Sequence, residues 1–462
     1  MFSKLGARLE SVQEFEKAPV PATRWKSWRS FLGMYAGEHT AGTEFVIGPL
    51  FVAHGVAAGD LVLGLLVGNL LAVLSWAFLC APIAVRERIT LYFKLEKICG
   101  KRLVTLYNLV NALMFCFLAG SMIAVSATAV GIPFDLPMAK LSDWLPSGVG
   151  WVVTVLVVGV ATTLVAMLGY DQVSRFSNLA APWMILVFLA AAIAVLPELG
   201  VSDAGDFWSV AESKIWTGVP IEGQSKFGFW HVLFFAWFCN MAMHIGMADL
   251  SVLRYAKSWH AGFASAGGMF VGHYLAWLAS GILYAVFLQK SQNAQEFAPG
   301  PIAYYAAGVA GAVCVIVAGW TTANPTIYRA GLAVQAVMPA SKTWKVTLIV
   351  GLITTVAACF PALVMRLLDF VALYGLLLMP MGAIIFMDVW IFPKWGLQSN
   401  LAALRHLHWN WAAALTWFLT LGACVFINRA FGVEIFFLGL PGWFVAVAVY
   451  ALLSYFFQKK TA

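Results

Sequence analysis

This sequence has few charged residues. Of its 462 residues only 11% are charged, whereas 62% are hydrophobic. A soluble protein of this length needs more polar side chains to cover its surface. The scarcity of charge therefore excludes an ordinary soluble globule and indicates a chain whose solvent is a lipid bilayer.

The sequence also lacks the motifs of common enzymes and metal sites. It contains no His-Glu-x-x-His, no Gly-x-Ser-x-Gly and no phosphate-binding loop, so we expect neither enzymatic activity nor a cofactor. The seven cysteines are scattered without disulfide or metal spacing, and His406 and His408 are too isolated to indicate a metal site. The net charge of +7 is typical of basic loops beside an anionic membrane leaflet, and we expect no nucleic-acid partner.

Long hydrophobic runs, by contrast, recur along nearly the whole chain. Most are long enough to cross a hydrocarbon core of about 30 Å as a helix that rises about 1.5 Å per residue. They predict about twelve transmembrane helices, at residues 29–56, 61–85, 103–130, 149–169, 174–196, 228–248, 262–287, 303–324, 344–365, 369–392, 410–428 and 434–457. The expected fold class is an all-α polytopic membrane protein.

The basic residues predict the orientation of these helices. Residues 1–28 are rich in Lys and Arg and hold no short apolar segment typical of a cleavable signal peptide, so we expect a cytoplasmic N-terminus. Most of the 28 Lys and Arg residues, including Lys94, Arg254 and Arg329, then fall in cytoplasmic loops or termini. The exceptions are Lys140, Lys214, Lys226, Lys290, Arg366 and Arg429. We expect a multi-pass protein of the cell (inner) membrane with both termini in the cytoplasm.

Two of the predicted helices are interrupted by small and polar residues. Helix 1 is broken between Gly37 and Glu44, and helix 6 between Asn240 and Gly246. Interruptions at matching positions of two halves indicate inverted repeats with a binding site at the membrane midplane. Alternatively, the glycines at these breaks only allow close helix packing. The carboxylates of helix 1 favour a function, because burying them in a membrane is costly.

Several motifs resemble the purine-cytosine permease group of the nucleobase:cation symporters. They are Gly37 to Gly48 in helix 1, Gly64 and Gly68-Asn69 in helix 2, Leu253-Arg254-Tyr255 after helix 6, Trp320 to Asn324 with Tyr328 and Gly331-Leu332 near helix 8, and Tyr374 to Asp388 in helix 10. The resemblance implies a LeuT-like fold of five plus five helices in inverted repeats. Its parts are a cytoplasmic segment 1–28, the repeats 29–196 and 228–392, two further helices within 410–457 and a cytoplasmic tail 458–462.

The resemblance also implies a sodium site between helices 1 and 8. Carried over by position, its ligands are the carbonyls of Gly37, Thr40 and Ala318 and the hydroxyls of Thr321 and Thr322. A hard cation takes oxygen ligands, and neutral oxygens permit its release. Alternatively, the two threonine hydroxyls bond back to their own helix.

In this family the substrate stacks on aromatic rings of helices 3 and 6 and is hydrogen-bonded from helices 1, 3, 6 and 8. On helix 3 an ungapped alignment places Leu118 at the stacking position, and a shift of one residue places the preferred Phe117 there. The other candidates for substrate binding are Thr43, Glu44, Asn111, Trp237, Asn240, His244 and Asn324. Alternatively, the asparagines join helices to one another and the aromatic rings face lipid. We interpret His231 and His273 as structural or interfacial residues.

Glu38 and Glu44 depart from the residues expected at these positions. Glu38 is a candidate for proton coupling or a partner of His244, and either carboxylate is suited to recognise an amine-bearing ring. Alternatively, the side chain of each glutamate extends toward the membrane surface so that its carboxylate reaches water, or the carboxylate accepts a hydrogen bond from the backbone. Asp249 and Asp388 lie near predicted helix ends, where we expect solvated or Arg-paired side chains.

Together these features predict a secondary active transporter. It would import a nucleobase or a related heterocycle, such as cytosine, uracil, a purine, allantoin or a hydantoin, by symport with sodium. Three alternatives remain: an amino-acid or amine carrier of the same fold, proton-coupled symport through Glu38, and a receptor that binds without transport.

Overall fold

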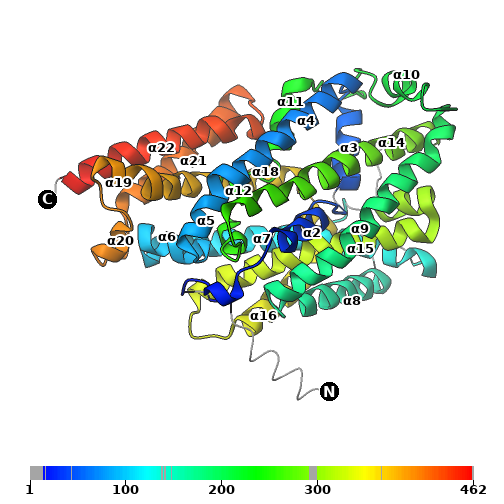
Figure 1. The fold of residues 1–462 in the computed structure, drawn as a ribbon. Coiled ribbons are helices and arrows are strands. Elements are labelled where there is room, and N and C mark those ends of the chain that lie inside the picture. Colours follow the sequence, from blue (N-terminus) through cyan, green and yellow to red (C-terminus); the bar gives the residue numbers. More distant parts are fainter. Residues whose placement is uncertain are drawn as a thin grey trace, which may run out of the picture.

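The computed structural model describes residues 14–15, 17–42, 44–136, 139, 142–146, 148–290, 299–365 and 367–459, and every long element in these ranges is a helix (Figure 1). Within them, nine apolar spans are long enough to cross a membrane: Ala58–Glu87, Lys101–Phe134, Val149–Ala166, Tyr170–Leu199, Trp259–Lys290, Ala307–Val337, Leu373–Trp395, Trp411–Phe431 and Ile435–Gln458. Three shorter apolar helices, Glu44–Ala53, Phe229–Phe238 and Thr343–Ala358, occupy positions predicted for helices 1, 6 and 9. The chain is therefore a multi-pass membrane protein.

Two long helices form the centre of the bundle, and the second of them is kinked at Ala307 and Gly308, whose backbone is not helical. These are α7 (Lys101–Val130) and α15 (Pro299–Val337), which pack along each other, while α21 (Trp411–Phe431) and α22 (Ile435–Lys459) pack on α18 (Leu367–Phe386) at the side (Figure 1). Other helical elements are α4 (Ala58–Ser75), η2 (Trp76–Cys80), α5 (Ala81–Glu87), α6 (Leu91–Cys99), α8 (Val149–Ala166), α9 (Tyr170–Val195), η7 (Gly267–Tyr274), α14 (Leu275–Lys290) and α16 (Thr343–Ala358). In membrane numbering α15 is helix 8, and η7 with α14 forms helix 7.

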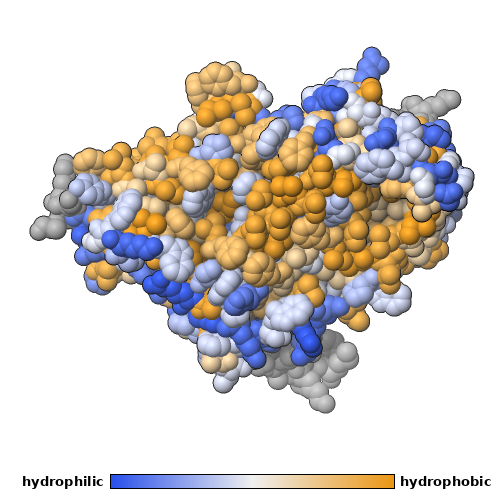
Figure 2. Space-filling model, turned by 45° about the horizontal axis from the view of Figure 1, so that its top comes forward, coloured by the Kyte–Doolittle hydropathy of each residue, from blue (hydrophilic) through white to orange (hydrophobic). Residues whose placement is uncertain are grey.

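Lipid-facing surfaces explain the large exposed apolar area. Figure 2 shows hydrophobic residues over most of one face and hydrophilic residues gathered toward opposite edges. On α4, Leu63, Leu66 and Leu70 are each about half exposed, at a spacing that places them on one side of the helix. Such a continuous apolar surface requires a non-aqueous neighbour, which the bilayer provides.

The two interrupted helices are broken where the sequence predicts. Helix 1 consists of α2 (Trp28–Glu38) and α3 (Glu44–Ala53), and helix 6 of α11 (Phe229–Phe238), α12 (Met241–His244) and α13 (Leu250–Leu253). In helix 1 the Thr40 N–H still donates to the Ala36 carbonyl at 3.0 Å, and the Glu44 N–H donates to the Ala41 carbonyl at 3.1 Å. Among the described residues, no backbone N–H donates to the carbonyls of Gly37 and Thr40, so both oxygens remain available at the break.

Helix 8 is longer than predicted. We expected it to end at residue 324, but α15 continues to Val337 and includes Arg329, which we had assigned to a loop. The assignment is wrong because Arg329 is only 1% exposed and is neutralised by acidic partners inside the bundle. Lys94 and Arg254 do lie between long helices, but they are buried as well, beside Asp388 and Glu14 respectively. At Arg329 the drop in hydropathy therefore marked a buried ion pair and not a helix end.

Helix 1 lies directly against the backbone of helix 7 on both sides of its break. A Cβ atom added to Gly268 would lie 2.9 Å from the Tyr35 carbonyl oxygen, and one added to Gly272 would lie 2.6 Å from that of His39. Beyond the break, a Cβ atom on Gly48 of α3 would lie 2.8 Å from the Gly281 nitrogen of α14. Only glycine allows backbones to approach this closely.

Candidate functional site

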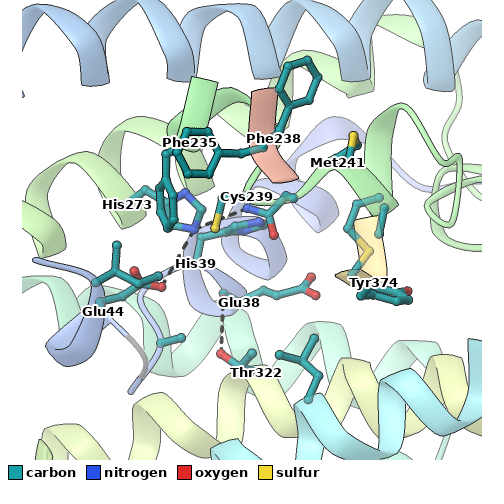
Figure 3. Close-up of a pocket in the computed structure, with 17 residues that line it drawn as sticks. Glu38, His39, Glu44, Phe235, Phe238, Cys239, Met241, His273, Thr322 and Tyr374 are labelled. Carbon is teal, nitrogen blue, oxygen red and sulfur yellow. Dashed lines mark hydrogen bonds and ion pairs between the residues drawn. The ribbon is translucent and has the colours of Figure 1, made fainter. Parts of the chain in front are cut away.

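A cavity of about 70 Å³ lies where the breaks of helices 1 and 6 meet (Figure 3). One water molecule needs only about 10–15 Å³ of cavity volume, so the cavity can hold a larger solute. Its lining comes from helix 1 (Glu38, His39, Ala41, Glu44 and Ile47), helix 3 (Leu118), helix 6 (Phe235, Phe238, Cys239, Asn240, Met241, Ala242 and Met243), helix 7 (His273), helix 8 (Thr322), helix 10 (Tyr374) and helix 12 (Phe436). The site thus unites residues that are far apart in sequence.

One end of the cavity is built on a buried ion triad. The Arg329 guanidinium contacts both carboxylate oxygens of Glu38, with Nη2 at 3.1 Å from Oε2, and the same Nη2 lies 2.8 Å from Asp249 Oδ1. Glu38 is 7% exposed and Asp249 is fully buried. Because the three residues come from α2, the segment before α13 and α15, the triad joins helices 1, 6 and 8.

Neutral donors complete the triad. The Tyr35 hydroxyl donates to Asp249 Oδ2 at 2.8 Å, and the Trp76 indole N–H donates to the same oxygen at 2.7 Å. Each of the four oxygens of Glu38 and Asp249 therefore has a donor. Buried charges persist only when paired and hydrogen-bonded in this way, and removing one partner is strongly destabilising. The triad corrects the expected pairing of Glu38, whose partner is Arg329 and not His244. Of the two expectations for Asp249, the Arg-paired one agrees with the structure, although the pair lies inside the bundle.

The other end of the cavity is built around Glu44. Its carboxylate accepts a hydrogen bond from the Trp277 indole N–H, and its Oε1 lies 3.8 Å from His273 Nε2 (Figure 3). Ser280 fixes the backbone by donating to the Glu44 carbonyl at 2.7 Å. The Asn240 amide lies 3.4 Å from His273 Nε2, which links the break of helix 6 to the same group.

Two imidazole rings lie between these ends. His39 and His273 pack edge to face with ring centroids 4.8 Å apart, and His273 stacks on Trp277 at 4.4 Å. His39 Nδ1 lies 2.8 Å from the Tyr35 carbonyl oxygen, an acceptor, so this nitrogen carries the proton. Sequence reasoning treated His273 as structural, because a single histidine in an apolar helix has no local signal of a site.

Helices 1 and 8 meet at a cluster of neutral oxygens. The Thr322 hydroxyl lies 2.9 Å from the Glu38 carbonyl oxygen and 3.3 Å from that of Ala318. The Thr321 hydroxyl lies 2.9 Å from the Ala318 carbonyl oxygen. Both threonine hydroxyls therefore bond back to their own helix, which was the alternative to sodium binding. Thr322 in addition links helix 8 to helix 1. The Thr40 hydroxyl also bonds back, donating to the Ala36 carbonyl at 2.7 Å.

Among the predicted substrate-binding residues, Glu44 and Asn240 line the cavity, and Thr43 lies outside the described residues. On helix 3, Leu118 lines the cavity, whereas the preferred Phe117 packs against the hydrophobic core. A shift of one residue rotates a side chain by about 100° around a helix, so only one of these two neighbours can face the cavity.

The other predicted residues have different surroundings. Trp237 donates from its indole to Ser75 at 3.0 Å, and Asn111 donates to the Tyr92 hydroxyl at 3.2 Å. His244 lies against Trp76, with its Nε2 at 3.1 Å from the Trp237 carbonyl oxygen. Asn324 is fully buried, and neither amide atom has a partner among the described residues. The structure therefore does not bring these four residues to the cavity surface.

Comparison with solved structures identifies the fold. Mhp1, a nucleobase-cation-symport-1 family transporter in a closed conformation with bromovinylhydantoin bound, matches with a TM-score of 0.70 at 15% identity over 96% of each chain. A substrate-bound Na⁺-coupled sialic acid symporter matches with a TM-score of 0.66 at 13% identity, over 98% of this chain and 96% of the other. MhsT in complex with L-phenylalanine matches with a TM-score of 0.55 at 15% identity, over 93% and 99%.

Sequence comparison adds nothing to this assignment, since no protein-family model and no curated protein sequence matches the chain. At such low identities the structural matches establish only the fold. They establish it for nearly the whole chain, because each match covers at least 93% of its residues. The predicted fold class is confirmed: this is an all-helical, polytopic membrane protein with a LeuT-like fold.

Proposed function

We propose that the protein is a secondary active transporter that carries a nucleobase or a related heterocycle together with a coupling cation. The observation that carries this proposal is the cavity between the two helix breaks, which combines aromatic rings with a few polar groups. Such a site at the meeting point of discontinuous helices is the usual substrate site of transporters that work by alternating access. Transport is further supported by the solved structures that share the fold, which include two symporters of different solutes.

The lining of the cavity suits a planar solute. Phe235, Phe238 and Tyr374 are among its lining residues, and stacking on an aromatic ring contributes about 1–3 kcal/mol per base. Asn240 offers a donor and an acceptor for the edge of a heterocycle. An amino acid is less well supported, because its carboxylate would enter a cavity lined by Glu38 and Glu44.

Uptake into proteoliposomes tests this function. Purified protein reconstituted with a sodium gradient should accumulate at least one radiolabelled heterocycle from a panel of cytosine, uracil, adenine, hypoxanthine, allantoin and hydantoin. Accumulation should collapse when the gradient is dissipated. Accumulation of amino acids in place of heterocycles would favour the amino-acid carrier, and binding without accumulation would favour a receptor.

We further propose sodium as the coupling ion, bound between helices 1 and 8. Support comes from the convergence of the Thr321 and Thr322 hydroxyls on the Ala318 carbonyl, close to the carbonyls of the helix 1 break. A sodium ion there would be coordinated by the same carbonyl oxygens that now accept hydrogen bonds from the threonine hydroxyls. Proton coupling through Glu38 is less well supported, because a carrier would have to break the contacts of both its oxygens with Arg329.

The change of Thr322 to valine should weaken sodium binding. It removes one ligand and the link to helix 1 while it preserves the shape of the side chain, and a ligand to a charged group is worth about 1.5–3 kcal/mol, or roughly 10- to 100-fold in affinity. The measurement is the melting temperature of purified protein as NaCl replaces KCl at constant ionic strength. The sodium concentration for half-maximal stabilisation should rise by that factor.

Thr326→Val is the matched control, since the Thr326 hydroxyl is also buried and, among the described residues, donates only to the Thr322 carbonyl of its own helix, at 2.7 Å. It should leave the sodium titration unchanged. A wild-type protein whose melting temperature is the same in sodium and potassium, with and without substrate, would contradict sodium coupling.

A further inference from the structure

A second depression lies at the end of the bundle that we expect in the cytoplasm. It has a volume of about 340 Å³ and is formed by α6, the start of α7, α20 (Leu401–Leu404) and the loop after α20. Figure 1 shows α6 and α20 side by side. The polar side chains in its lining are those of Glu96, Lys97, Lys101, His406 and His408. No described residue lines both this depression and the substrate cavity, so it is a separate feature.

Backbone hydrogen bonds hold the walls of this depression together. The Asn410 N–H donates to the Cys99 carbonyl at 2.9 Å, and the Arg102 N–H donates to the His408 carbonyl at 3.0 Å. Gly100, which has a φ of +86°, makes this approach possible, because a Cβ atom there would lie 2.6 Å from the carbonyl carbon of His408. The loop after α20 is thus fixed against the junction of α6 and α7, and the depression is preformed.

The basic side chains of the depression lack acidic partners. Among the described residues, neither Lys97 nor Lys101 pairs with a carboxylate, whereas Lys94 of the same helix is buried 3.2 Å from Asp388. Glu96 is the only acid in the described lining. The two histidines each carry at least one N–H that can donate a hydrogen bond. The depression therefore offers two ammonium groups and two imidazole donors to an anion.

The depression also borders a surface that faces lipid. On α7, the exposed Arg102 is followed by Leu106, Leu109 and Leu113, which are all exposed. Steps of four, three and four residues place these four side chains on one side of the helix. Trp411, which is 60% exposed, begins α21 directly after the loop, and tryptophan is typical of the boundary between membrane and water. An anion in the depression would thus lie beside hydrocarbon.

From these observations we propose that the depression binds the phosphate head group of an anionic phospholipid, whose acyl chains lie along the exposed leucines of α7. Lys97 and Lys101 complement the charge of the phosphate, and His406 and His408 donate hydrogen bonds to its oxygens. A soluble phosphate compound would share these polar contacts but would make no use of the apolar stripe that begins at Arg102. The site lies outside the substrate cavity and adds lipid recognition to the transport function proposed above.

Binding of defined lipids to the purified full chain tests this proposal. Native mass spectrometry resolves individual bound lipids and gives a dissociation constant for each. The probes are phosphatidylglycerol and phosphatidylcholine with identical acyl chains, so that only the head group differs. The wild type should bind its first phosphatidylglycerol at least about tenfold more tightly than phosphatidylcholine, and glycerol phosphate or inorganic phosphate should not displace it.

Two double variants locate the site. Lys97→Gln with Lys101→Gln should remove most of the preference, because each basic residue near an anionic lipid contributes about fivefold in affinity. Lys342→Gln with Lys345→Gln removes the same charge from exposed positions at the start of α16 and should preserve the preference.

Three outcomes would overturn the proposal. The first is equal affinity of the wild type for the two lipids, a comparison that needs no variant to fold. The second is a preference that survives in Lys97→Gln with Lys101→Gln, or one that falls equally in both double variants, which would indicate unspecific attraction. The third is displacement of the lipid by glycerol phosphate or inorganic phosphate, which would assign the site to soluble phosphate compounds. All three would leave the proposed transport function standing.

Discussion

Replacing Arg329 with methionine is expected to destabilise the protein severely. The substitution would leave Glu38 and Asp249 buried without their shared cation, since Arg329 contacts both carboxylates. Removing one partner of a buried ion pair costs about 3–5 kcal/mol. We expect a large fall in the apparent melting temperature in detergent and a smaller monodisperse fraction on size exclusion.

Two further variants make this test specific. Arg429→Met removes an exposed arginine and should have little effect. Adding Glu38→Gln and Asp249→Asn to Arg329→Met should restore part of the lost stability, because the remaining groups are then neutral. If Arg329→Met were as stable as the wild type, or if the triple variant were no better than the single one, the triad would not hold helices 1, 6 and 8 together.

The second large effect is expected at Glu14, a buried residue that precedes helix 1. Its carboxylate accepts hydrogen bonds from the Tyr255 hydroxyl at 2.9 Å, the Tyr328 hydroxyl at 2.6 Å and the Tyr170 N–H at 3.0 Å. It also lies 3.6 Å from Arg254 Nη2. One side chain thus fastens the chain before helix 1 to α9, to α15 and to the segment after α13.

Glu14→Ala should cost about 3 kcal/mol, because it leaves the buried Arg254 without its carboxylate and the two tyrosine hydroxyls without an acceptor. The N-terminal segment should then detach more often, and trypsin should cut it faster after Arg24 or Lys26. Limited proteolysis followed by mass spectrometry measures this rate. Glu222→Ala is the exposed control, and an unchanged rate for Glu14→Ala would show that Glu14 does not fasten the segment.

Much of the fold could be predicted from the sequence because its signals are local. Hydrophobic length marks a membrane span, and a short polar interruption marks a broken helix, as at Gly37 to Glu44. The same logic failed for Arg329, because hydropathy does not distinguish a cation in a loop from one that is neutralised by Glu38 and Asp249 inside the bundle. Only the packing of three helices makes that difference visible.

The site was less predictable because most of it depends on contacts between helices. Asn240 and Glu44 were identified, since polar residues at a helix break are conspicuous in the sequence. His273 was missed, because its role depends on Glu44 and Asn240, which lie on other helices. Leu118 and Phe117 differ by one position, and an alignment without a reliable anchor does not fix the rotation of a helix to that precision.

The glycine contacts between helices 1 and 7 have a mechanical consequence for transport. Gly268 and Gly272 touch helix 1 before and at its break, and Gly48 touches helix 7 beyond it. Interlocked backbones resist sliding, so a motion that opens the cavity to one side must carry helix 7 along with helix 1. Glu44 and His273, one on each helix, would then keep their separation throughout the cycle. Access to the solute would change while the geometry that recognises it stays constant.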